Sequence, residues 1–480
     1  MRTECQEDSY RFQGLGRRDV VARFDGGAIT SDGGGLLLRE VEGRSGIIAR
    51  FARGFADHRD PELIQHTLEE LIRQRVYGLC LGYEDLNDHD DLRHDPLLAV
   101  LVGKTDPTGE NRHGRDQGKP LAGKSTLNRL ELTPAGADCD SRYQKIVARH
   151  HELEQSFVEI FIDQHTTPPT EIILDLDSTD DPVHGHQLGR FFQGYYREYC
   201  FLPLYIFCGQ YPLCAKLRPA DIDASAGSLK QVQRLVKRLR EVWPEIPITL
   251  RADSGFCRDN LMSWCEANQV RYVFGLPKNT RLLKVIGREQ HEAKVAFDQS
   301  GKASRVFADF TYRTKKSWST ERRVVGKAEH LSKGANPRFI VSNIPSSERG
   351  AKELYEQVYC ARGEMENRIK EQQLCLFADR TSCRSMRANQ LRLWFSTLAY
   401  VLLNVLRERG LKGTQFEAAR CDTIRTKLLK IGAAITITVR KVWVQLASAC
   451  PYQNVFESAW KNLLAWQPQV AGLPIQLESS

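Results

Sequence analysis

The stretch EIILDLDSTDD, residues 171–181, joins a short apolar run to a cluster of aspartates. A pair of prolines precedes it and Pro182 follows it, a pattern typical of a bounded β-strand. Asp175 and Asp177 lie two residues apart, so a strand places both side chains on one face. A carboxylate inside an apolar strand is costly unless it is paired or bound to a metal. The segment therefore indicates a chemical site or, alternatively, a strand that ends in an Asp-rich turn.

The segments after this strand predict a mixed α/β sheet, because strand and helix patterns alternate along the chain. The expected strands lie at 200–208, 213–219, 247–253 and 271–276, and the expected helices at 228–243 and 258–268. The segments VFADFTYRT, RRVVGK and RFIVSNI then predict a β-rich insertion over 282–350. A helical pattern returns at 351–374.

This organisation predicts four parts of the chain. Residues 1–165 are expected to be mainly helical, and residues 166–281 and 351–410 to form the sheet domain around the insertion 282–350. Residues 411–480 are expected to form a basic C-terminal region. Between Arg407 and Lys441 there are nine Lys or Arg against three acids. That stretch is equally consistent with a DNA contact and with a solvated surface.

A second acid, Asp253, ends the strand expected at 247–253. The carboxyl ends of strands are where α/β folds place ligands. A single aspartate at this position is weak evidence, because many such residues only cap the helix that follows.

A third acid, Glu366, lies on the helix expected at 351–374. Tyr359, Arg362 and Glu366 follow one another at steps of three and four, so they share one helix face, and Lys370 extends the row. The alternative is a solvated polar stripe. Gly363 costs this helix about 1 kcal/mol relative to alanine and indicates close packing or close approach of another group.

Taken together, the acids favour a metal site. Carboxylates from a first strand, a later strand end and a later helix can converge on one edge of a mixed sheet. Hard oxygen ligands of this kind suit Mg²⁺ or Mn²⁺. Two such ions about 4 Å apart can serve phosphodiester chemistry.

These motifs resemble those of the DDE transposases of bacterial insertion sequences, and more narrowly the insertion-sequence family numbered thirteen-eighty. The resemblance extends over nearly the whole chain. It rests on GYEDLNDHDDLRHDPL (82–97), LDLDSTDDPVHGHQ (174–187), LRADSGF (250–256), YCARGEMENRIKE (359–371) and ASACP (447–451). It implies a ribonuclease-H-like catalytic domain with a β-rich insertion before the catalytic Glu.

The resemblance also implies an activity. It implies metal-dependent cleavage of double-stranded DNA at transposon ends and strand transfer into target DNA, with two Mg²⁺ or Mn²⁺ ions and a homodimer in the synaptic complex. Residues 1–165 are expected to bind the terminal inverted repeats. The alternatives are a ribonuclease-H-like nuclease or resolvase that does not join DNA, and a catalytically silent, transposase-derived DNA-binding protein.

Carried over to this sequence, the resemblance implies Asp177, Asp253 and Glu366 as the catalytic, metal-binding acids. Asp177 is preferred to Asp175, which stays open as a further ligand, because Asp177 directly precedes Ser-Thr as the first Asp of the family does. The resemblance implies contacts of Tyr359 and Arg362 with DNA phosphates.

One position departs from the pattern of the wider group. That pattern has a Lys seven residues after the Glu, where this chain has Gln373. Lys370 lies on the same face of the helix, one turn closer to Glu366. We therefore expect Lys370 to bind phosphate in place of the missing lysine.

The segment GKPLAGKST, residues 118–126, matches the spacing of a phosphate-binding loop. Such a loop needs a buried strand before it, and the preceding residues ENRHGRDQ cannot form one. Pro120 also removes a backbone N–H that the loop would use. An ATPase is therefore not expected. The segment is a loop that enters a helix, or a short DNA-contacting helix with Lys124 and Arg129 exposed.

The composition limits the remaining classes of protein. Lys and Arg outnumber Asp and Glu by 68 to 60, for a net charge of +8, which permits a polyanionic partner without requiring one. The thirteen Cys residues form no C-x-x-C pair, as expected of reduced thiols. The polar N-terminus is unlike a signal peptide, and the longest apolar run, 393–406, is short for a bilayer. We expect a cytoplasmic, nucleoid-associated protein.

Two patterns favour structural roles over sites. His184 and His186 lack an evident third metal ligand. The basic helix expected at 228–243 is either a solvated face or a track for DNA.

Overall fold

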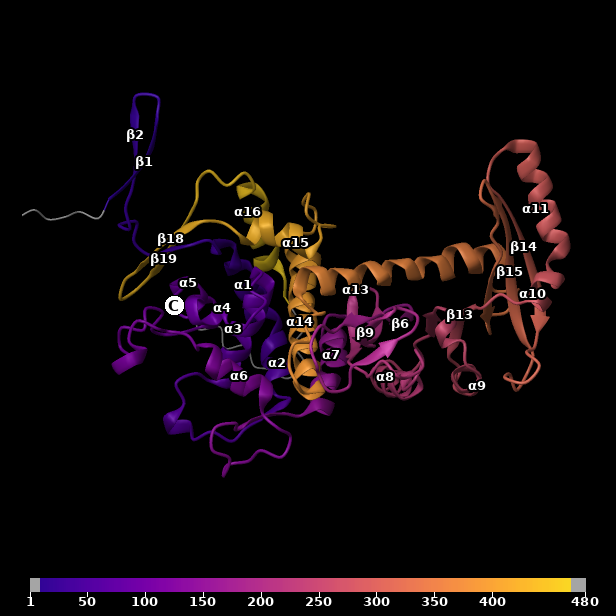
Figure 1. Cartoon of the computed structure of the whole chain (residues 1–480), viewed down its shortest axis with the longest axis horizontal. Coiled ribbons are helices and arrows are strands. Elements are labelled where there is room, and N and C mark those ends of the chain that lie inside the picture. The colour runs from indigo at the N-terminus through magenta and orange to yellow at the C-terminus, as the bar shows by residue number, and fades with distance from the viewer. Residues whose placement is uncertain (1–8, 468–480) are drawn as a thin grey trace, which may run out of the picture. The chain divides into compact units, whose positions relative to one another are not determined.

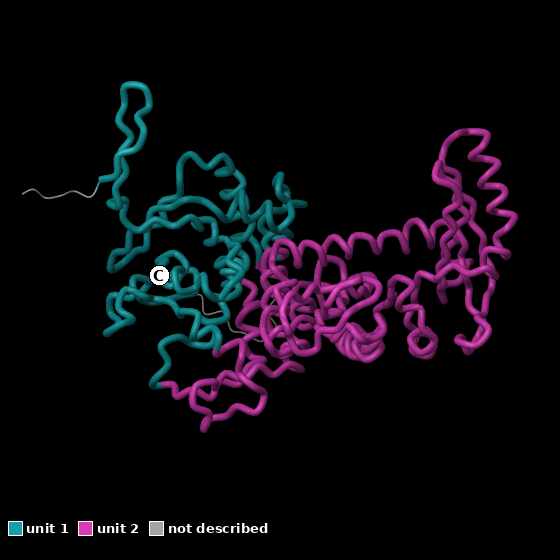
Figure 2. The backbone as a smooth tube through the Cα atoms, in the orientation of Figure 1, with its two compact units in different colours: residues 1–43, 62–128, 405–466 teal, residues 44–61, 129–404, 467–480 magenta. Residues whose placement is uncertain are grey.

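The computed structural model describes residues 9–467, which form two compact units (Figure 2). The first unit comprises residues 9–43, 62–128 and 405–466, and the second comprises residues 44–61, 129–404 and 467. None of the described helices is both long and apolar enough to cross a membrane.

The second unit contains a mixed sheet, which has nine strands within the described residues (Figure 1). The strand order is β11-β10-β6-β12-β13-β17-β15-β14, and β16 pairs with β15. The bounds are β6 Ile172–Ser178, β10 Leu204–Cys208, β11 Tyr211–Lys216, β12 Ile248–Ala252, β13 Arg271–Leu276, β14 Ser304–Tyr312, β15 Arg322–Leu331, β16 Gly334–Ala335 and β17 Arg338–Ser342. β6 is antiparallel to β10 and parallel to β12, which in turn is parallel to β13. The carboxyl ends of β6 and β12 therefore lie at the same edge of the sheet.

Helices and short strands complete the second unit. Its helices are α2 Ile47–Ala52, α7 His150–Asp163, α8 Ser228–Val242, α9 Asp259–Ala267, α10 Thr280–Val285, α11 Gly287–Ser300, α12 Ala351–Glu353, α13 Gly363–Leu376 and α14 Met386–Val405. Its short strands are β4 Phe55–Asp57, β5 Ile146–Ala148, β7 Asp181–Pro182, β8 Phe191–Gln193 and β9 Glu198–Phe201. α8 shows why the sequence folds this way: Val232, Leu235, Val236 and Leu239 recur at helical spacing and are all buried.

The segment 282–350 differs from the β-rich insertion that was predicted. Its first part forms α10 and α11, and α11 lies along β14 and β15 (Figure 1). The sequence of α11, GREQHEAKVAFDQS, is rich in strong helix formers, and Ala293 is its buried residue. Because so few apolar residues mark the helix, its periodicity is weak.

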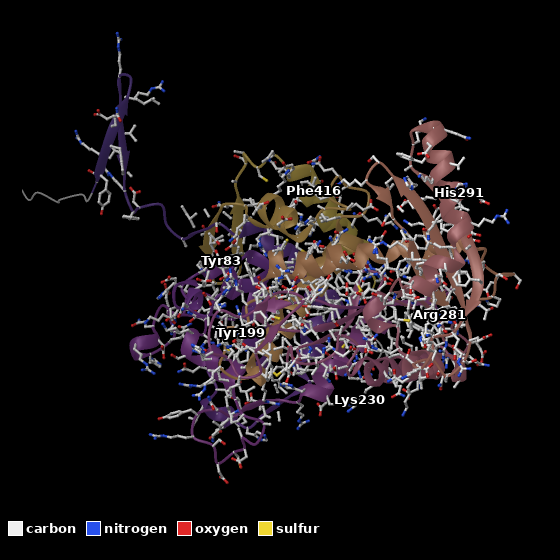
Figure 3. All side chains as sticks on the ribbon, turned by 45° about the vertical axis from the view of Figure 1, so that its right-hand side comes forward. Tyr83, Tyr199, Lys230, Arg281, His291 and Phe416 are labelled. Atoms are coloured by element: carbon white, nitrogen blue, oxygen red, sulfur yellow. The ribbon has the colours of Figure 1, made fainter. Side chains whose placement is uncertain are left out.

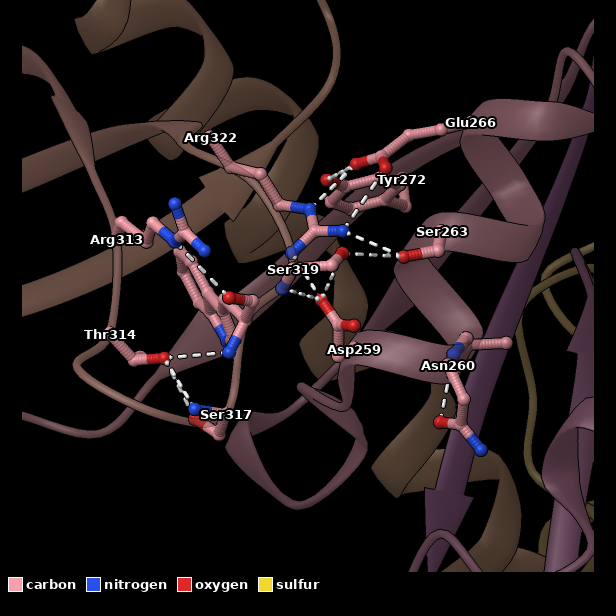
Figure 4. A network of polar contacts seen from close by, with 12 residues as sticks. Asp259, Asn260, Ser263, Glu266, Tyr272, Arg313, Thr314, Ser317, Ser319 and Arg322 are labelled. Carbon is pink, nitrogen blue, oxygen red and sulfur yellow. Dashed lines mark hydrogen bonds and ion pairs between the residues drawn. The ribbon is translucent and has the colours of Figure 1, made fainter.

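The strands of this segment continue the central sheet. β17 pairs with β13, and β15 pairs with β17. The buried Arg322 of β15 also binds α9, where its guanidinium donates to Asp259 at 2.7 Å and to Glu266 at 2.7 Å (Figure 4). The segment is therefore part of the same compact unit as β6 and β12.

The first unit combines both ends of the described chain. Its elements are β1 Tyr10–Leu15, β2 Arg18–Ala22, β3 Ile29–Thr30, α1 Leu36–Ser45, α3 Leu68–Leu81, α4 Asp88–Leu92, α5 Pro96–Val102, α15 Cys421–Ile424, β18 Ala433–Ile437, β19 Val442–Leu446 and α16 Gln453–Ala465. α6 Lys124–Leu132 crosses the boundary between the units. α3 begins with a capping box between Thr67 and Glu70 and ends at Gly82, which has a φ of 97°.

The division of the chain differs from the four predicted parts. β3 and β18 form a strand pair, so residues near the N-terminus and residues beyond 410 share one unit. β4 pairs with β5 and α2 packs on α7, which places 44–61 and 129–165 in the second unit. These pairings join positions far apart in sequence, and local patterns do not reveal them.

Candidate active site

The three acids predicted from the sequence line one cavity of the second unit, together with Asp180 and Asp223. Asp177 lies near the end of β6, Asp253 follows β12 directly, and Glu366 lies in the first turn of α13. The cavity has a volume of about 800 Å³, and all three residues line it. The parallel pairing of β6 with β12 brings the first two acids to one sheet edge, and α13 brings the third.

Arg362 connects two of these acids. Its guanidinium donates to Asp177 Oδ2 at 3.2 Å and to Glu366 Oε1 at 2.8 Å. Within residues 9–467, no group of three or more His, Cys, Asp and Glu side chains is gathered closely enough to hold a metal ion. The Arg362 cation instead occupies the space between the carboxylates of Asp177 and Glu366.

Asp177 is held in an environment that disfavours its charge. Burial raises the pKa of its carboxyl to about 6, Arg362 opposes this increase, and the charges of Asp253 and Glu366 add to it. Two neighbouring negative charges that raise the cost of ionising Asp177 favour a cation beside it. The acceptor-only oxygens present here are the ligands that Mg²⁺ prefers, so the donor set fits a divalent ion.

The sequence leaves Asp175 open as a further metal ligand, but in the structure its carboxylate forms an ion pair. Both of its carboxylate oxygens accept from Arg251 on β12, at 2.6 and 2.7 Å, and the Asp175 side chain is 2% exposed. Arg251 also donates to the backbone carbonyl of Val358. Asp175 thus ties β6 and β12 together beneath the cavity and is not among the residues that line it.

The helix that carries Glu366 is irregular before the site. Residues 354–359 form a π-helical turn and residues 360–362 a 3₁₀ turn between α12 and α13. Insertions of this kind re-aim side chains and are frequent at functional sites. The π-helical turn ends at Tyr359, and the 3₁₀ turn lies between Tyr359 and Glu366, the residues predicted to share one face.

Tyr359 lies against β13 and the loop after β12. A Cβ atom at Gly275 would come within 2.7 Å of the Tyr359 hydroxyl and within 2.9 Å of the Ser254 backbone nitrogen. Because glycine has no Cβ atom, this position leaves room for the Tyr359 hydroxyl next to the backbone of Asp253. Burial raises the pKa of Tyr359, Arg362 lowers it, and Asp253 raises it.

Gly363 does not have the close neighbour that was predicted. No atom lies within 4 Å of a Cβ built at this residue, so the position is open in the structure. The close approach that was inferred from its sequence occurs at Gly275 instead.

Lys370 and Gln373 both line the cavity, and they lie about one turn apart on α13. Lys370 is exposed. The Gln373 side-chain amide donates to the Asp180 carbonyl at 3.0 Å. Lys370 is therefore an exposed cation on this wall, while Gln373 binds the loop after β6.

No sequence pattern singles out Arg218, which supports the rim of the cavity. Its buried guanidinium donates to the carbonyls of Leu202, Ala224 and Ala226 and to Ser178 Oγ. Burial lowers its pKa to about 10. Ser178 follows Asp177, and Ala224 also lines the cavity, so Arg218 holds both walls in place. A buried arginine on carbonyl groups leaves no spacing signal in a sequence.

The other predicted DNA contacts lie away from this cavity's lining. Lys124 begins α6 and forms an ion pair with Asp90 at 3.3 Å. Arg129 lies over the ring of Tyr143, 5.7 Å from its centroid. A phosphate-binding loop needs a strand before it, and the described residues 103–123, which precede α6, contain no strand.

The basic side chains of helix α8 fall into two groups: some bind neighbouring elements, and others are exposed. Arg238 binds Glu159 on α7, and Arg240 donates to the carbonyl of Asn268. Lys230 and Lys237 are exposed; Figure 3 labels Lys230. The arginines therefore fasten the helix to its neighbours, and two lysines remain for a partner.

Comparisons with known proteins place the chain in a family. No protein in a curated set matches the sequence. Among solved structures, the chain is similar to one described as a cryo-EM structure of a piggyBac transposase synaptic complex with hairpin DNA, at 13% identity and a TM-score of 0.39, over 92% of this chain and 83% of that chain. A family model described as "Transposase DDE domain group 1" matches residues 12–468, and the chain therefore belongs to this family of DDE transposases.

Proposed function

We propose that this protein cleaves phosphodiester bonds at the ends of a transposon and joins the freed ends to target DNA, with Asp177, Asp253 and Glu366 as its catalytic acids. The observation that carries the proposal is the convergence of these three side chains, from β6, the end of β12 and α13, on one cavity. Membership of the transposase family supports the activity.

In this proposal, two cations of the cavity and the neighbouring Tyr359 would bind the DNA strand. Lys370 is an exposed cation on its wall and would bind a phosphate of the cleaved strand. Arg362 already binds carboxylate oxygens, and its planar guanidinium is equally suited to phosphate oxygens. Tyr359 would position the strand from beside Asp253.

We further propose that Asp177, Asp253 and Glu366 hold two Mg²⁺ or Mn²⁺ ions. When bound, such ions would neutralise the charge that develops on the attacking and leaving oxygens. Asp175 is left out of this ligand set because Arg251 occupies both of its oxygens. Arg362 would then exchange its carboxylate partners for DNA phosphates.

The sheet supports a ribonuclease-H-like assignment of the catalytic domain. Strands β11, β10 and β6 are antiparallel neighbours, and β12 and β13 continue from β6 in parallel. The acids lie at the end of the central strand β6 and of its parallel neighbour. We propose that two copies of the chain act together on paired transposon ends, in the cytoplasm at the nucleoid.

The test is cleavage of an end-labelled duplex that carries the terminus of the protein's own element, with Mg²⁺. Wild type should cut this duplex, and Glu366→Gln should lose the activity. Glu364→Gln is a matched control, because Glu364 lies on the same helix, pairs with Arg368 and does not line the cavity. Equal cutting by wild type and Glu366→Gln would refute the assignment. Joining of the cut end to a second duplex separates a transposase from a nuclease that does not join DNA.

A further inference from the structure

Within the described residues 9–467, the hairpin of β1 and β2 has no packing partner for either face. Every residue of Tyr10–Leu15 and Arg18–Ala22 is exposed. A two-stranded hairpin is marginally stable by itself in water. A ribbon with both faces exposed is therefore completed by a partner.

The tip of the hairpin is basic. Gly16 turns the chain with a φ of 63°, and Arg17 and Arg18 follow it. The side chains of Arg11, Arg17 and Arg18 form no hydrogen bond or ion pair with other residues in the described part of the chain. These guanidinium groups are thus available to an external anion.

The two faces of the hairpin differ in character. The cross-strand pairs Tyr10–Ala22 and Phe12–Val20 lie on one face, and Arg11 pairs with Val21 on the other. Phe24 extends the first face, with its ring 5.8 Å from that of Tyr10 in an edge-on arrangement. Aromatic and basic side chains therefore alternate over residues 10–12, at the base of the ribbon.

We propose that the β1–β2 hairpin is a DNA-binding arm that enters a groove of the duplex, with Arg17 and Arg18 on phosphate oxygens. This proposal rests on the proposed function, since it supplies a contact to the DNA that the cavity would cut. The major groove of B-DNA is about 12 Å wide and accommodates a two-stranded β-ribbon. Exposed aromatic rings can pack on thymine methyl groups in the groove once the arginines have docked.

A second copy of the chain fits the hairpin less well than DNA does. Stable protein interfaces take about 20–30 residues from each partner. The apolar face of the ribbon offers only Tyr10, Phe12, Val20, Ala22 and Phe24. The unpaired arginines at the tip would also repel the same tip of another copy.

The experiment measures binding of the full chain to a 40-base-pair duplex of its element's end, in EDTA, from 50 to 300 mM salt. Arg17→Gln/Arg18→Gln should weaken binding at 100 mM salt at least tenfold. The slope of log affinity against log salt should fall by about 2, because each lost phosphate contact removes about one unit. Arg17→Lys/Arg18→Lys keeps both charges and should retain the wild-type slope.

The matched control is Lys315→Gln/Lys316→Gln, which removes two adjacent exposed cations from a loop of the second unit. An equal effect of the control and the hairpin variant would show general electrostatics and overturn the proposal. Wild-type affinity and slope in the hairpin variant would also overturn it. So would an unchanged slope combined with conversion of a DNA-free dimer to a monomer, which would assign the hairpin to a second copy.

The binding experiment also separates this proposal from the catalytic one. Loss of binding in the hairpin variant, with the Mg²⁺-dependent cut abolished by Glu366→Gln, supports both proposals. Tight binding by wild type with no cleavage under any metal would refute the catalytic proposal alone. Absence of DNA binding by wild type would refute both.

Discussion

The guanidinium of Arg251 binds both carboxylate oxygens of Asp175, at 2.6 and 2.7 Å, between two neighbouring strands of the central sheet. Both side chains are buried, and removing one charge of such a pair costs about 3–5 kcal/mol. We therefore predict that Asp175→Asn lowers the free energy of unfolding by about 3 kcal/mol. Urea unfolding at pH 7 would measure this, and a change below 0.5 kcal/mol, the range of ordinary surface substitutions, would contradict it.

Asp177→Asn should have the opposite effect. The pKa of Asp177 is raised to about 6 in the folded protein, against an ordinary value of 3.8. Between these values the folded state binds the proton more tightly than the unfolded state. The contribution of Asp177 to the free energy of unfolding therefore falls as pH rises from about 4 to 6 and is flat above.

Replacing Asp177 with asparagine removes this penalty. Without divalent ions, we expect the variant to be about 3 kcal/mol more stable than wild type at pH 8. The gain should disappear below pH 4, where the wild-type carboxyl is protonated in both states. Thermal or urea unfolding across pH 3.5–8 in EDTA would test this. A gain that is constant with pH would show that the carboxyl is not the cause.

The two glycines near the site should respond differently to alanine. At Gly275 a Cβ atom would meet the Tyr359 hydroxyl at 2.7 Å and backbone atoms of Ser254 and Asp253 at 2.9 and 3.2 Å. We expect Gly275→Ala to displace the Asp253 loop and to reduce cleavage at least tenfold. Gly363→Ala meets no atom within 4 Å and should instead stabilise its helix by about 0.5–1 kcal/mol. Cleavage rates and unfolding of both variants would test the contrast, which equal behaviour would disprove.

Lys370 and Gln373 can be separated by alanine substitution. Lys370 is the exposed cation of the cavity wall, whereas Gln373 donates to the Asp180 carbonyl. We expect Lys370→Ala to weaken binding of the cleaved DNA end and to lower the salt slope by about 1. Gln373→Ala should leave the slope unchanged. A lower slope in Gln373→Ala alone would assign the phosphate contact to the position of the group's usual lysine.

Local patterns could predict the central strands but not the way the chain divides. β13 was expected at 271–276 and is found there, because its apolar run is short and clearly bounded. The irregular turn at 354–359 was not predictable, since π-helical geometry follows from packing rather than from residue type. The pairing of β3 with β18 was likewise invisible, because a two-residue strand carries no periodicity.

The candidate site was predictable to the extent that its acids lie at strand ends and on a helix face. Asp177, Asp253 and Glu366 line one cavity, as the sequence indicated. The sequence could not show that Asp175 pairs with Arg251 and has a structural role, because alternation places Asp175 and Asp177 on the same face of β6. Only the register of β6 with β12, which sets Arg251 beside Asp175, distinguishes the structural acid from the acid that we propose to be catalytic.

Arg322 provides a test of whether 282–350 is an independent insertion. Its side chain is 2% exposed and joins β15 to Asp259 and Glu266 of α9. These two acids are 28% and 30% exposed, so water can solvate them once the arginine is removed. We therefore expect Arg322→Met to cost about 3 kcal/mol, the lower end for a buried pair.

The matched control is Arg305→Met on β14. Arg305 also binds two acids but is 51% exposed, and its buried partner Glu329 keeps an ion pair with Lys327, so the loss of Arg305 should cost at most about 1 kcal/mol. Because β15 and β17 continue the central sheet, Arg322→Met should still unfold the second unit in a single transition of the sheet signal. A separate early transition, with β14–β17 melting before the rest of the sheet, would show instead that the segment is an autonomous insertion.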